Sequence, residues 1–333
     1  MPLSGFKDVI GHEQIIAHLS NSLKNNKVSH AYIFNGEDGT GKNMLAKLFA
    51  KALQCEAGYG DSCGMCRSCR QVDSGNQPDI RWVTHEKPSS IGVDEIREQV
   101  NNDIAIKPYS SKYKIYIIDE AQKMTPQAQN ALLKTIEEPP SYGVIMLLTD
   151  NAQQLLPTIS SRCVTLNMKA IAQDKIQNYL MKTYEIPDYK AKICASYAQG
   201  NMGKAIKMAT SSDFNELHEF VLRLVKGVDN LDVHEIMDVI RKLSEYKDEI
   251  YDIIDMMMVW YRDILMLKLT NDPNLLIYPE EYSALSRRAS KASFEGLDTI
   301  IRALEKAKVR LRANVNFDTA MEMMLLTIKE ELR

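Results

Sequence analysis

Short apolar runs alternate with longer amphipathic segments over the first half of the chain. Five runs rich in β-branched and aromatic residues each predict a strand, at 31–34, 80–83, 114–118, 144–148 and 164–166. Between them, apolar residues recur three and four positions apart, which predicts amphipathic helices such as 91–104 and 125–138. Strands that alternate with helices are typical of a doubly wound, mainly parallel five-stranded α/β sheet.

The strand pattern stops after Met168. Short helical patterns follow over 170–208, and from about 211 onward every periodic segment is helical. Apolar residues spaced three and four apart predict helices at 217–224, 233–243, 250–269, 297–311 and 319–332. The run Met256-Met257-Met258 and Trp260 are interpreted as packed core, with an adaptable interaction surface as the alternative.

The first predicted strand and the next helix are joined by Gly36-Glu37-Asp38-Gly39-Thr40-Gly41-Lys42-Asn43, which fits the pattern G-x-x-x-x-G-K. Its glycines let backbone N–H groups point at a phosphate, the helix start adds partial positive charge, and Lys42 reaches the terminal phosphates. The stretch is therefore interpreted as a phosphate-binding loop, with a ligand-free glycine-rich turn as the alternative. The candidate nucleotide-binding residues are Gly36, Gly39, Thr40, Gly41, Lys42 and Asn43.

Asn43 stands where this pattern usually has the Ser or Thr that coordinates Mg²⁺, and an amide oxygen is a poorer ligand there. The third strand ends in Asp119 and Glu120, and the carboxyl ends of parallel strands face the ligand in open α/β sheets. We expect Asp119 to hold Mg²⁺ and Glu120 to polarise the attacking water, although an acidic pair is by itself often a helix cap. Thr149, which ends the fourth strand, joins the candidate nucleotide site.

Four of the six cysteines lie between the loop's helix and the second strand, at Cys55, Cys63, Cys66 and Cys69. Two overlapping C-x-x-C units plus a fourth cysteine can hold one tetrahedral ion with Zn–S bonds of about 2.3 Å, and four thiolates leave no open position. The segment of about 55–69 is therefore predicted to be a structural zinc module. Reduced thiols, a redox pair and an iron–sulfur cluster are the alternatives.

Length and charge add only broad limits. A chain of 333 residues is too long for one ordinary core, and a formal charge of −3 demands neither nucleic acid nor a membrane as a partner. The N-terminus has no apolar segment of a signal peptide, and the most apolar later stretch, 253–267, is interrupted by Asp255, Arg262 and Asp263. These features predict a cytoplasmic protein.

Several motifs together resemble those of bacterial clamp-loader subunits of the AAA+ class, from the DNA polymerase III holoenzyme. The motifs are the residues 29–34, the four-cysteine module, Ser74-Gly75-Asn76-Gln77-Pro78-Asp79, the run 131–139 and Ser161-Arg162-Cys163. The likeness covers the whole chain in architecture and is sharpest from 29 to 163. Within this family, Asn43 favours the delta-prime type over the gamma or tau motor. So does Gly203, which falls where the motor has its second-sensor arginine.

The resemblance implies an ATPase-like AAA+ domain over 1–168, a helical lid over 169–209 and an all-α collar over 210–333 that closes a five-membered ring. Implied partners are the gamma or tau and delta subunits and, through the complex, the sliding clamp and primer–template DNA. Arg162 matches the arginine that reaches into a neighbour's ATP site, an arrangement worth about 10³ to 10⁵ in rate in other nucleotide hydrolases.

The implied function is that of a stator in DNA replication, one subunit of a nucleotidyltransferase holoenzyme with structural Zn²⁺. ATP and Mg²⁺ are expected to bind this chain weakly or not at all, which leaves Glu120 as a vestigial or weak base. Two other classes stay open. A self-contained ATPase motor of the gamma or tau type would turn over alone. A zinc-dependent DNA-binding module would need a basic, aromatic surface, and the cysteine segment offers only Arg67, Arg70 and Tyr59.

Overall fold

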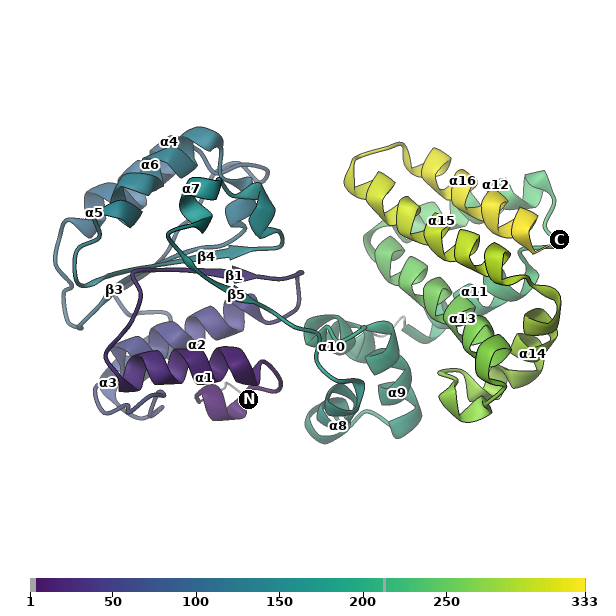
Figure 1. Ribbon diagram of the computed structural model, residues 1–333, viewed down its shortest axis with the longest axis horizontal. Helices are drawn as coiled ribbons and strands as arrows, with labels where there is room; N and C mark the ends of the chain where they lie inside the picture. The colour runs from purple at the N-terminus through teal and green to yellow at the C-terminus, as the bar shows by residue number, and fades with distance from the viewer. Residues whose placement is uncertain (1–3, 212–213, 333) are drawn as a thin grey trace. The chain divides into compact units, whose positions relative to one another are not determined.

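Five parallel strands form a single sheet in the first half of the chain. In a computed structural model that describes residues 4–211 and 214–332, neighbouring strands pair in the order β2-β3-β4-β1-β5 (Figure 1). The strands are Ala31–Asn35 (β1), Ile80–Trp82 (β2), Lys114–Ile118 (β3), Gly143–Thr149 (β4) and Val164–Asn167 (β5). Each pair is parallel, so all carboxyl ends meet at one edge. The predicted α/β class is confirmed.

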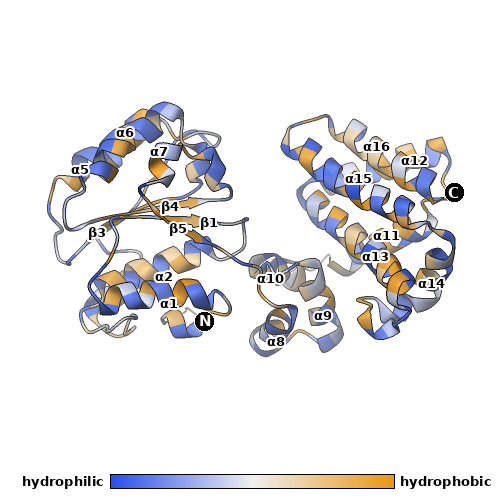
Figure 2. Ribbon diagram, viewed as in Figure 1, coloured by the Kyte–Doolittle hydropathy of each residue, from blue (hydrophilic) through white to orange (hydrophobic). Residues whose placement is uncertain are grey.

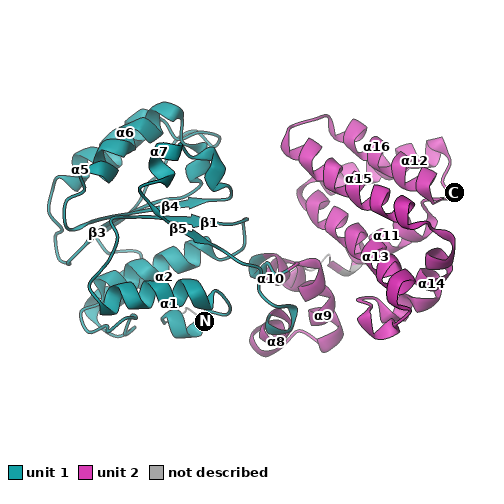
Figure 3. Ribbon diagram, in the orientation of Figure 1, with its two compact units in different colours: residues 1–175, 200–203 teal, residues 176–199, 204–333 magenta. Residues whose placement is uncertain are grey.

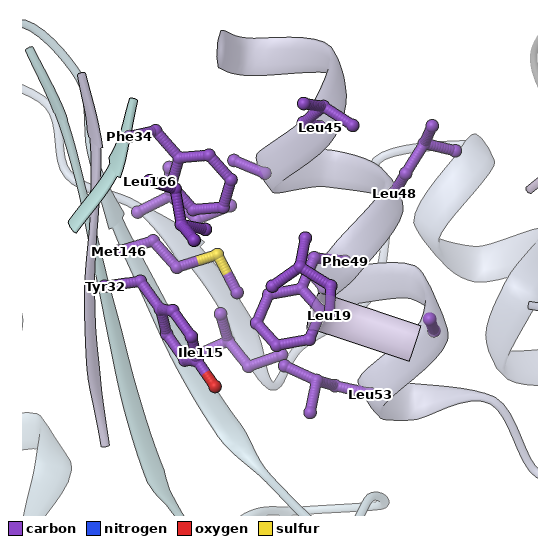
Figure 4. Packing of buried hydrophobic residues seen from close by; sticks show 14 of the residues in the cluster. Leu19, Tyr32, Phe34, Leu45, Leu48, Phe49, Leu53, Ile115, Met146 and Leu166 are labelled. Atoms are coloured by element: carbon purple, nitrogen blue, oxygen red, sulfur yellow. The ribbon is translucent and has the colours of Figure 1, made fainter. Parts of the chain in front are cut away.

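Helices cover both faces of the sheet and bury an apolar core on each (Figure 1). On one face, Phe49 meets Tyr32 edge-on with ring centroids 5.1 Å apart, inside the cluster drawn in Figure 4. Strands β3 and β4 are buried along their whole length, which explains their uninterrupted apolar sequence. The helices of the first face are α1 (Glu13–Lys24) and α2 (Lys42–Gln54), and those of the second are α4 (Val93–Ile96), α5 (Asn102–Ile104), α6 (Pro126–Glu137) and α7 (Pro157–Ser160).

Two local features differ from the sequence-based expectation. The helix expected over 91–104 is present over 93–104, but its middle turn, Arg97–Asn101, is π-helical and lies between the α-helical ends α4 and α5. Within that turn, the amide of Asn101 donates to the carbonyl of Ala131 and accepts from the hydroxyl of Thr135, both at 2.9 Å, which fastens the turn to α6. A short helix, α3 (Arg67–Asp73), also forms inside the cysteine segment, where no periodicity predicted one.

The chain divides into two compact units, Met1–Lys175 with Gly200–Gly203 and Ile176–Gln199 with Lys204–Arg333 (Figure 3). Within the described residues, the second unit contains helices and no strand, as predicted. The chain beyond the sheet forms α8 (Gln173–Tyr184), α9 (Asp188–Tyr197), α10 (Met202–Thr210), α11 (Phe214–Gly227), α12 (Val233–Glu245), α13 (Ile250–Thr270), α14 (Tyr282–Lys291), α15 (Phe294–Arg312) and α16 (Phe317–Glu331). The boundary between a lid and a collar near residue 209 stays a prediction.

Helix α13 is the centre of the second unit. Figure 2 shows its largely apolar colouring beside the more amphipathic α15. Met256, Met257 and Trp260 are buried, as expected of packed core. Asp255 is also buried, and it accepts hydrogen bonds from Lys204 of α10 and Lys308 of α15. Two cations neutralise this carboxylate, so its burial fastens three helices together without leaving an unpaired charge.

Across residues 4–211 and 214–332, none of the helices combines the length and the apolar character needed to span a bilayer.

Candidate functional site

The predicted phosphate loop follows β1 and leads directly into α2. Gly39 and Gly41 have φ angles of 81° and 97°, in the left-handed region that glycine adopts without strain. Gly41 caps α2, which begins at Lys42, so the unpaired N–H groups of the helix start lie at the loop. The N–H of Gly36 donates to the carbonyl of Thr149 at 3.0 Å and ties the loop to the end of β4. The loop thus has the backbone features that phosphate binding requires.

Lys42 is turned back onto its own loop. Its side chain is buried, and its ammonium donates to the carbonyl oxygens of Gly36 at 2.6 Å and Glu37 at 3.0 Å. A bound phosphate would compete with these two neutral acceptors for the same cation, and charge-assisted bonds to an anion are the stronger kind.

The start of α10 lies directly on the loop. The N–H of Gly203 donates to the carbonyl of Gly39 at 2.9 Å, and the amide of Asn201 donates to the carbonyl of Asp38 at 2.6 Å. A Cβ added to Gly203 would lie 2.7 Å from the Cα and the carbonyl oxygen of Gly39, so a larger residue requires this backbone to move. Gly203 therefore contacts the loop through its backbone and adds no charge there.

The acidic residues after β3 have partners of their own. The Asn43 amide donates to Oδ2 of Asp119 at 3.0 Å, which joins the two positions assigned to Mg²⁺. Glu120 has a left-handed φ of 48°, and its carboxylate accepts from the ammonium of Lys123 at 2.7 Å, with Nε2 of His85 at 4.0 Å. The carboxylate of Glu120 is thus occupied by the Lys123 ammonium, and an attacking water would have to compete with this lysine for it.

A cavity of about 300 Å³ lies beside the loop. His12 lines it, with a left-handed φ of 57°, and its Nε2 hydrogen-bonds the carbonyl of Thr40 at 3.0 Å. This bond requires a protonated Nε2, which leaves Nδ1 as a buried acceptor with no partner among the described residues. Burial lowers the pKa of His12, so the ring is neutral at pH 7. Other lining residues are Gly11, Ile15, Asn167, Ile171 and Lys175.

The four predicted cysteines form one compact cluster. Their sulfur atoms all lie within 4.8 Å of one another. The Cys55–Cys66 and Cys63–Cys69 sulfur pairs are 4.0 and 3.9 Å apart, close to the edge of about 3.8 Å of a tetrahedron with Zn–S bonds of about 2.3 Å. The donor set therefore fits a single metal ion that four thiolates enclose.

Backbone N–H groups surround this cluster. The N–H groups of Cys63, Cys66 and Cys69 donate to the sulfurs of Cys55, Cys63 and Cys66 at 3.3 to 3.4 Å. The N–H groups of Met65 and Cys66 hold the pKa of the Cys63 thiol down to about 6, whereas burial raises the pKa values of Cys55 and Cys69. A metal must therefore displace protons from the thiols of Cys55 and Cys69, which makes binding dependent on pH.

The N-terminal turn is fastened to the cysteine segment. Asp61 accepts from the N–H of Phe6 at 2.9 Å, and the hydroxyl of Ser62 donates to the carbonyl of Ser4 at 2.7 Å. Order in the cysteine segment is thus linked to order in the turn that precedes α1.

Arg162 lies at the other edge of the sheet. It follows α7 and precedes β5, whose Val164 pairs with Tyr32, whereas the phosphate loop comes after the last residue of β1. Because all strands are parallel, Arg162 belongs to the amino edge and the loop to the carboxyl edge. Its side chain is 41% exposed, and the guanidinium contacts Oε1 of Glu137 at 3.0 Å and the carbonyl of Thr158 at 3.0 Å.

The tertiary structure groups some of the predicted residues and separates others. The loop, Asn43, Asp119 and the fully buried Thr149 gather at the carboxyl edge, because β4 lies between β1 and β3. The cysteines form their own centre, and Arg162 stands apart from both groups. Sequence reasoning passed over the partners Lys123, Glu137 and Asn201. The spacing of Glu120 and Lys123, three residues apart, could have revealed the first, but no local pattern marks the other two.

Sequence comparisons connect the chain to known proteins. Residues 11–172 match the family described as DNA polymerase III, delta subunit, and residues 213–330 match its C-terminal counterpart. The chain is 30% identical over 321 residues to DNA polymerase III subunit delta' of Bacillus subtilis, covering 95% of this chain and 96% of that protein. It is also 30% identical over 345 residues to subunit tau of the same organism, covering 95% of this chain and 60% of that protein. A solved gamma subunit-related protein of Thermotoga maritima covers 96% of this chain and 99% of its own, at 19% identity with a TM-score of 0.45.

Proposed function

The chain belongs to the DNA polymerase III clamp-loader family that includes the delta-prime and gamma/tau subunits, and on this premise we propose that it acts as a delta-prime stator. In this role it stays in place within the ring and offers Arg162 to the ATP site of a neighbouring subunit. Its own nucleotide site contributes little hydrolysis.

The position of Arg162 carries this proposal. The arginine lies at the amino edge of the sheet, whereas the chain's own phosphate loop lies at the carboxyl edge. A five-residue parallel strand spans roughly 17 Å, so the guanidinium is too far away to act on a phosphate in its own loop. Exposed at that edge, its planar fork is available to a phosphate that another subunit holds.

The chain's own nucleotide site supports the same assignment. Asn43 supplies an amide where Mg²⁺ prefers a hydroxyl, and Lys123 neutralises the carboxylate of Glu120. Gly203 contributes no charge where a second-sensor arginine would approach the phosphates. Lys42 and the glycines remain, so weak nucleotide binding is compatible with this site while hydrolysis lacks its metal ligand and its base.

The metal in the four-cysteine cluster is assigned as zinc. Four thiolates without an open position suit structural Zn²⁺, and the separations between the sulfurs match its tetrahedral geometry. When bound, the ion supplies folding energy rather than chemistry. The four cysteines would hold the segment 55–69 in place and, through Asp61, the N-terminal turn.

The proposed partners follow from the family. They are the gamma or tau and delta subunits in a five-membered ring and, through that ring, the sliding clamp and primer–template DNA. From the proposed role in DNA replication we also expect a cytoplasmic protein.

The proposal is tested in a reconstituted clamp loader that contains this chain and its motor subunits. Arg162→Ala should reduce DNA-stimulated ATP hydrolysis and clamp loading by at least about 100-fold per affected site, toward the range measured for other arginine fingers. Zinc content and ring assembly should stay unchanged. Lys42→Ala in the same chain should change the rate by less than about two-fold, because this site contributes little hydrolysis.

A gamma or tau type motor is the second candidate, and two observations favour it. The chain is as similar in identity to a tau subunit as to a delta-prime subunit, and Lys42 and Asp119 are both present. A motor requires the opposite ranking of the two variants, with Lys42 essential and Arg162 dispensable, together with brisk ATP turnover by the isolated chain.

A further inference from the structure

We propose that Glu137 is a positioning residue for ATP hydrolysis in the neighbouring subunit, because its carboxylate sets the orientation of the Arg162 guanidinium. This inference rests on the proposed function of Arg162. It adds a residue from a different helix, 25 positions earlier in the chain, to the machinery of the same reaction.

The guanidinium is held at two points. Oε1 of Glu137 lies 3.0 Å from Nη2, and Nη1 donates to the carbonyl of Thr158 at 3.0 Å, with the hydroxyl of Ser161 at 3.3 Å. Thr158 and Ser161 belong to the segment that carries Arg162, so these bonds alone allow the side chain to move with its own turn. Among the residues that the structure describes, Glu137 makes the polar contact that links the guanidinium to a different helix of the domain.

The topology explains why this carboxylate is there. Helix α6 follows β3, runs back across the sheet and ends at Glu137 just before β4, so its last turn lies at the amino edge. The same helix also holds the chain that leads to α7, because the buried amide of Gln129 accepts from the N–H of Leu156 at 2.7 Å and donates to the carbonyl of Met124 at 3.1 Å. Helix α6 therefore fixes the backbone before Arg162 through Gln129 and the side chain through Glu137.

The Glu137–Arg162 ion pair is weak enough to orient the guanidinium without keeping it from a phosphate. Glu137 and Arg162 are 48% and 41% exposed, and exposed ion pairs are held by only a small free energy. Three of the five guanidinium N–H groups face Glu137, Thr158 and Ser161, which leaves two for a phosphate. In a subunit interface that excludes water, a phosphate attracts the guanidinium more strongly than the exposed Glu137 does. Glu137 can therefore orient the guanidinium and still release it to the phosphate.

The test uses the complete reconstituted complex with Glu137→Gln, which keeps the size of the side chain and removes its charge. We expect kcat for DNA-stimulated ATP hydrolysis to fall about three- to ten-fold with KM unchanged, because misorientation weakens a contact made in the transition state. Glu138→Gln is the matched control. Glu138 is the adjacent exposed carboxylate and forms no ion pair within the described residues, so kcat should stay at the wild-type value.

The double variant Glu137→Gln with Arg162→Ala decides whether Glu137 acts through Arg162. Its kcat should equal that of Arg162→Ala alone, since there is no guanidinium left to orient. A further fall in the double variant, an unchanged kcat in Glu137→Gln, or an increased kcat would each overturn the inference. Failure of the underlying function looks different, because Arg162→Ala by itself would then hydrolyse ATP at the full rate.

Discussion

The side-chain amide of Asn43 donates a hydrogen bond to Oδ2 of Asp119 at 3.0 Å. These match the two positions at which phosphate-loop nucleoside triphosphatases hold Mg²⁺, one at the start of α2 and the other after β3. In this chain an NH₂ group faces the carboxylate, so a direct hydrogen bond joins the residues that a metal would otherwise bridge. The Asn43 amide thus gives the Asp119 carboxylate a hydrogen-bond donor in place of a cation.

Asn43→Thr is expected to restore part of the metal site. A hydroxyl is a ligand for Mg²⁺ and also donates to Asp119, so Mg²⁺-dependent affinity for ATP should rise by about ten-fold, the lower end of the effect of a metal-site partner. Titration of the isolated chain with a fluorescent ATP analogue, with and without Mg²⁺, measures this change. Hydrolysis should remain slow because Lys123 still pairs with Glu120. Equal affinity in Mg²⁺ and in EDTA for the variant would contradict the role given to Asn43.

Gly203→Ala is expected to destabilise the protein by about 1 to 3 kcal/mol, because the new methyl group would lie 2.7 Å from the backbone of Gly39. Thermal unfolding of the isolated wild-type and variant chains measures this loss of stability. The matched control is Gly227→Ala in the last turn of α11, where an added Cβ has no atom within 4 Å and should be neutral or slightly stabilising. Similar unfolding temperatures for the two variants would show that α10 can leave the loop without cost.

Removal of the metal is expected to unfold the segment 55–69 and release the N-terminal turn that Asp61 and Ser62 hold. Elemental analysis of the native protein should give about one zinc per chain. After chelation, limited trypsin digestion should cut at Lys7, Arg67 and Arg70, and added zinc should restore protection.

The variant Cys66→Ser should behave like the chelated protein, whereas Cys194→Ser, at a cysteine outside the cluster, should keep its zinc. A folded, protected protein with four titratable thiols and no metal would refute the assignment.

His218 is expected to make the second unit less stable in mild acid. Its ring is stacked between Phe214 and Tyr278, and its Nε2 is buried with no hydrogen-bond partner among the described residues. Burial lowers the pKa of His218, while Glu219, Glu281 and Glu280 oppose that shift and Lys226 adds to it. As the pH falls, His218 therefore takes up a proton at a higher pH in the unfolded chain than in the folded protein. The stabilisation is complete above the ordinary histidine pKa of about 6.5 and is lost as the pH falls through the lower folded value.

His218→Phe keeps the ring stacking and removes the titrating group. Denaturant unfolding at pH 7.5 and pH 5 should show a smaller loss of stability for this variant than for the wild type. Some loss should remain, because burial also lowers the pKa of His12 in the first unit. An identical pH dependence in both proteins would exclude His218 as a cause.

Local patterns along the sequence determined the elements and much of the chemistry. Short runs of β-branched and aromatic residues located the five strands, and period-3.6 apolar spacing located most of the helices, because both patterns depend on near neighbours in the chain. The cysteine spacing and the phosphate-loop pattern are equally local, since each site is built largely from one short segment. The structure confirmed that the four thiols converge.

Only the tertiary structure decided what those local groups face. Strand order put β4 between β1 and β3 and so brought Asn43 to Asp119, and the parallel direction of β5 set Arg162 at the edge opposite the loop. The contact of Glu137 with Arg162 and the approach of Gly203 to Gly39 join residues that are 25 and 164 positions apart. Such contacts depend on how whole helices and strands pack, and packing leaves no periodic trace in the sequence around either partner.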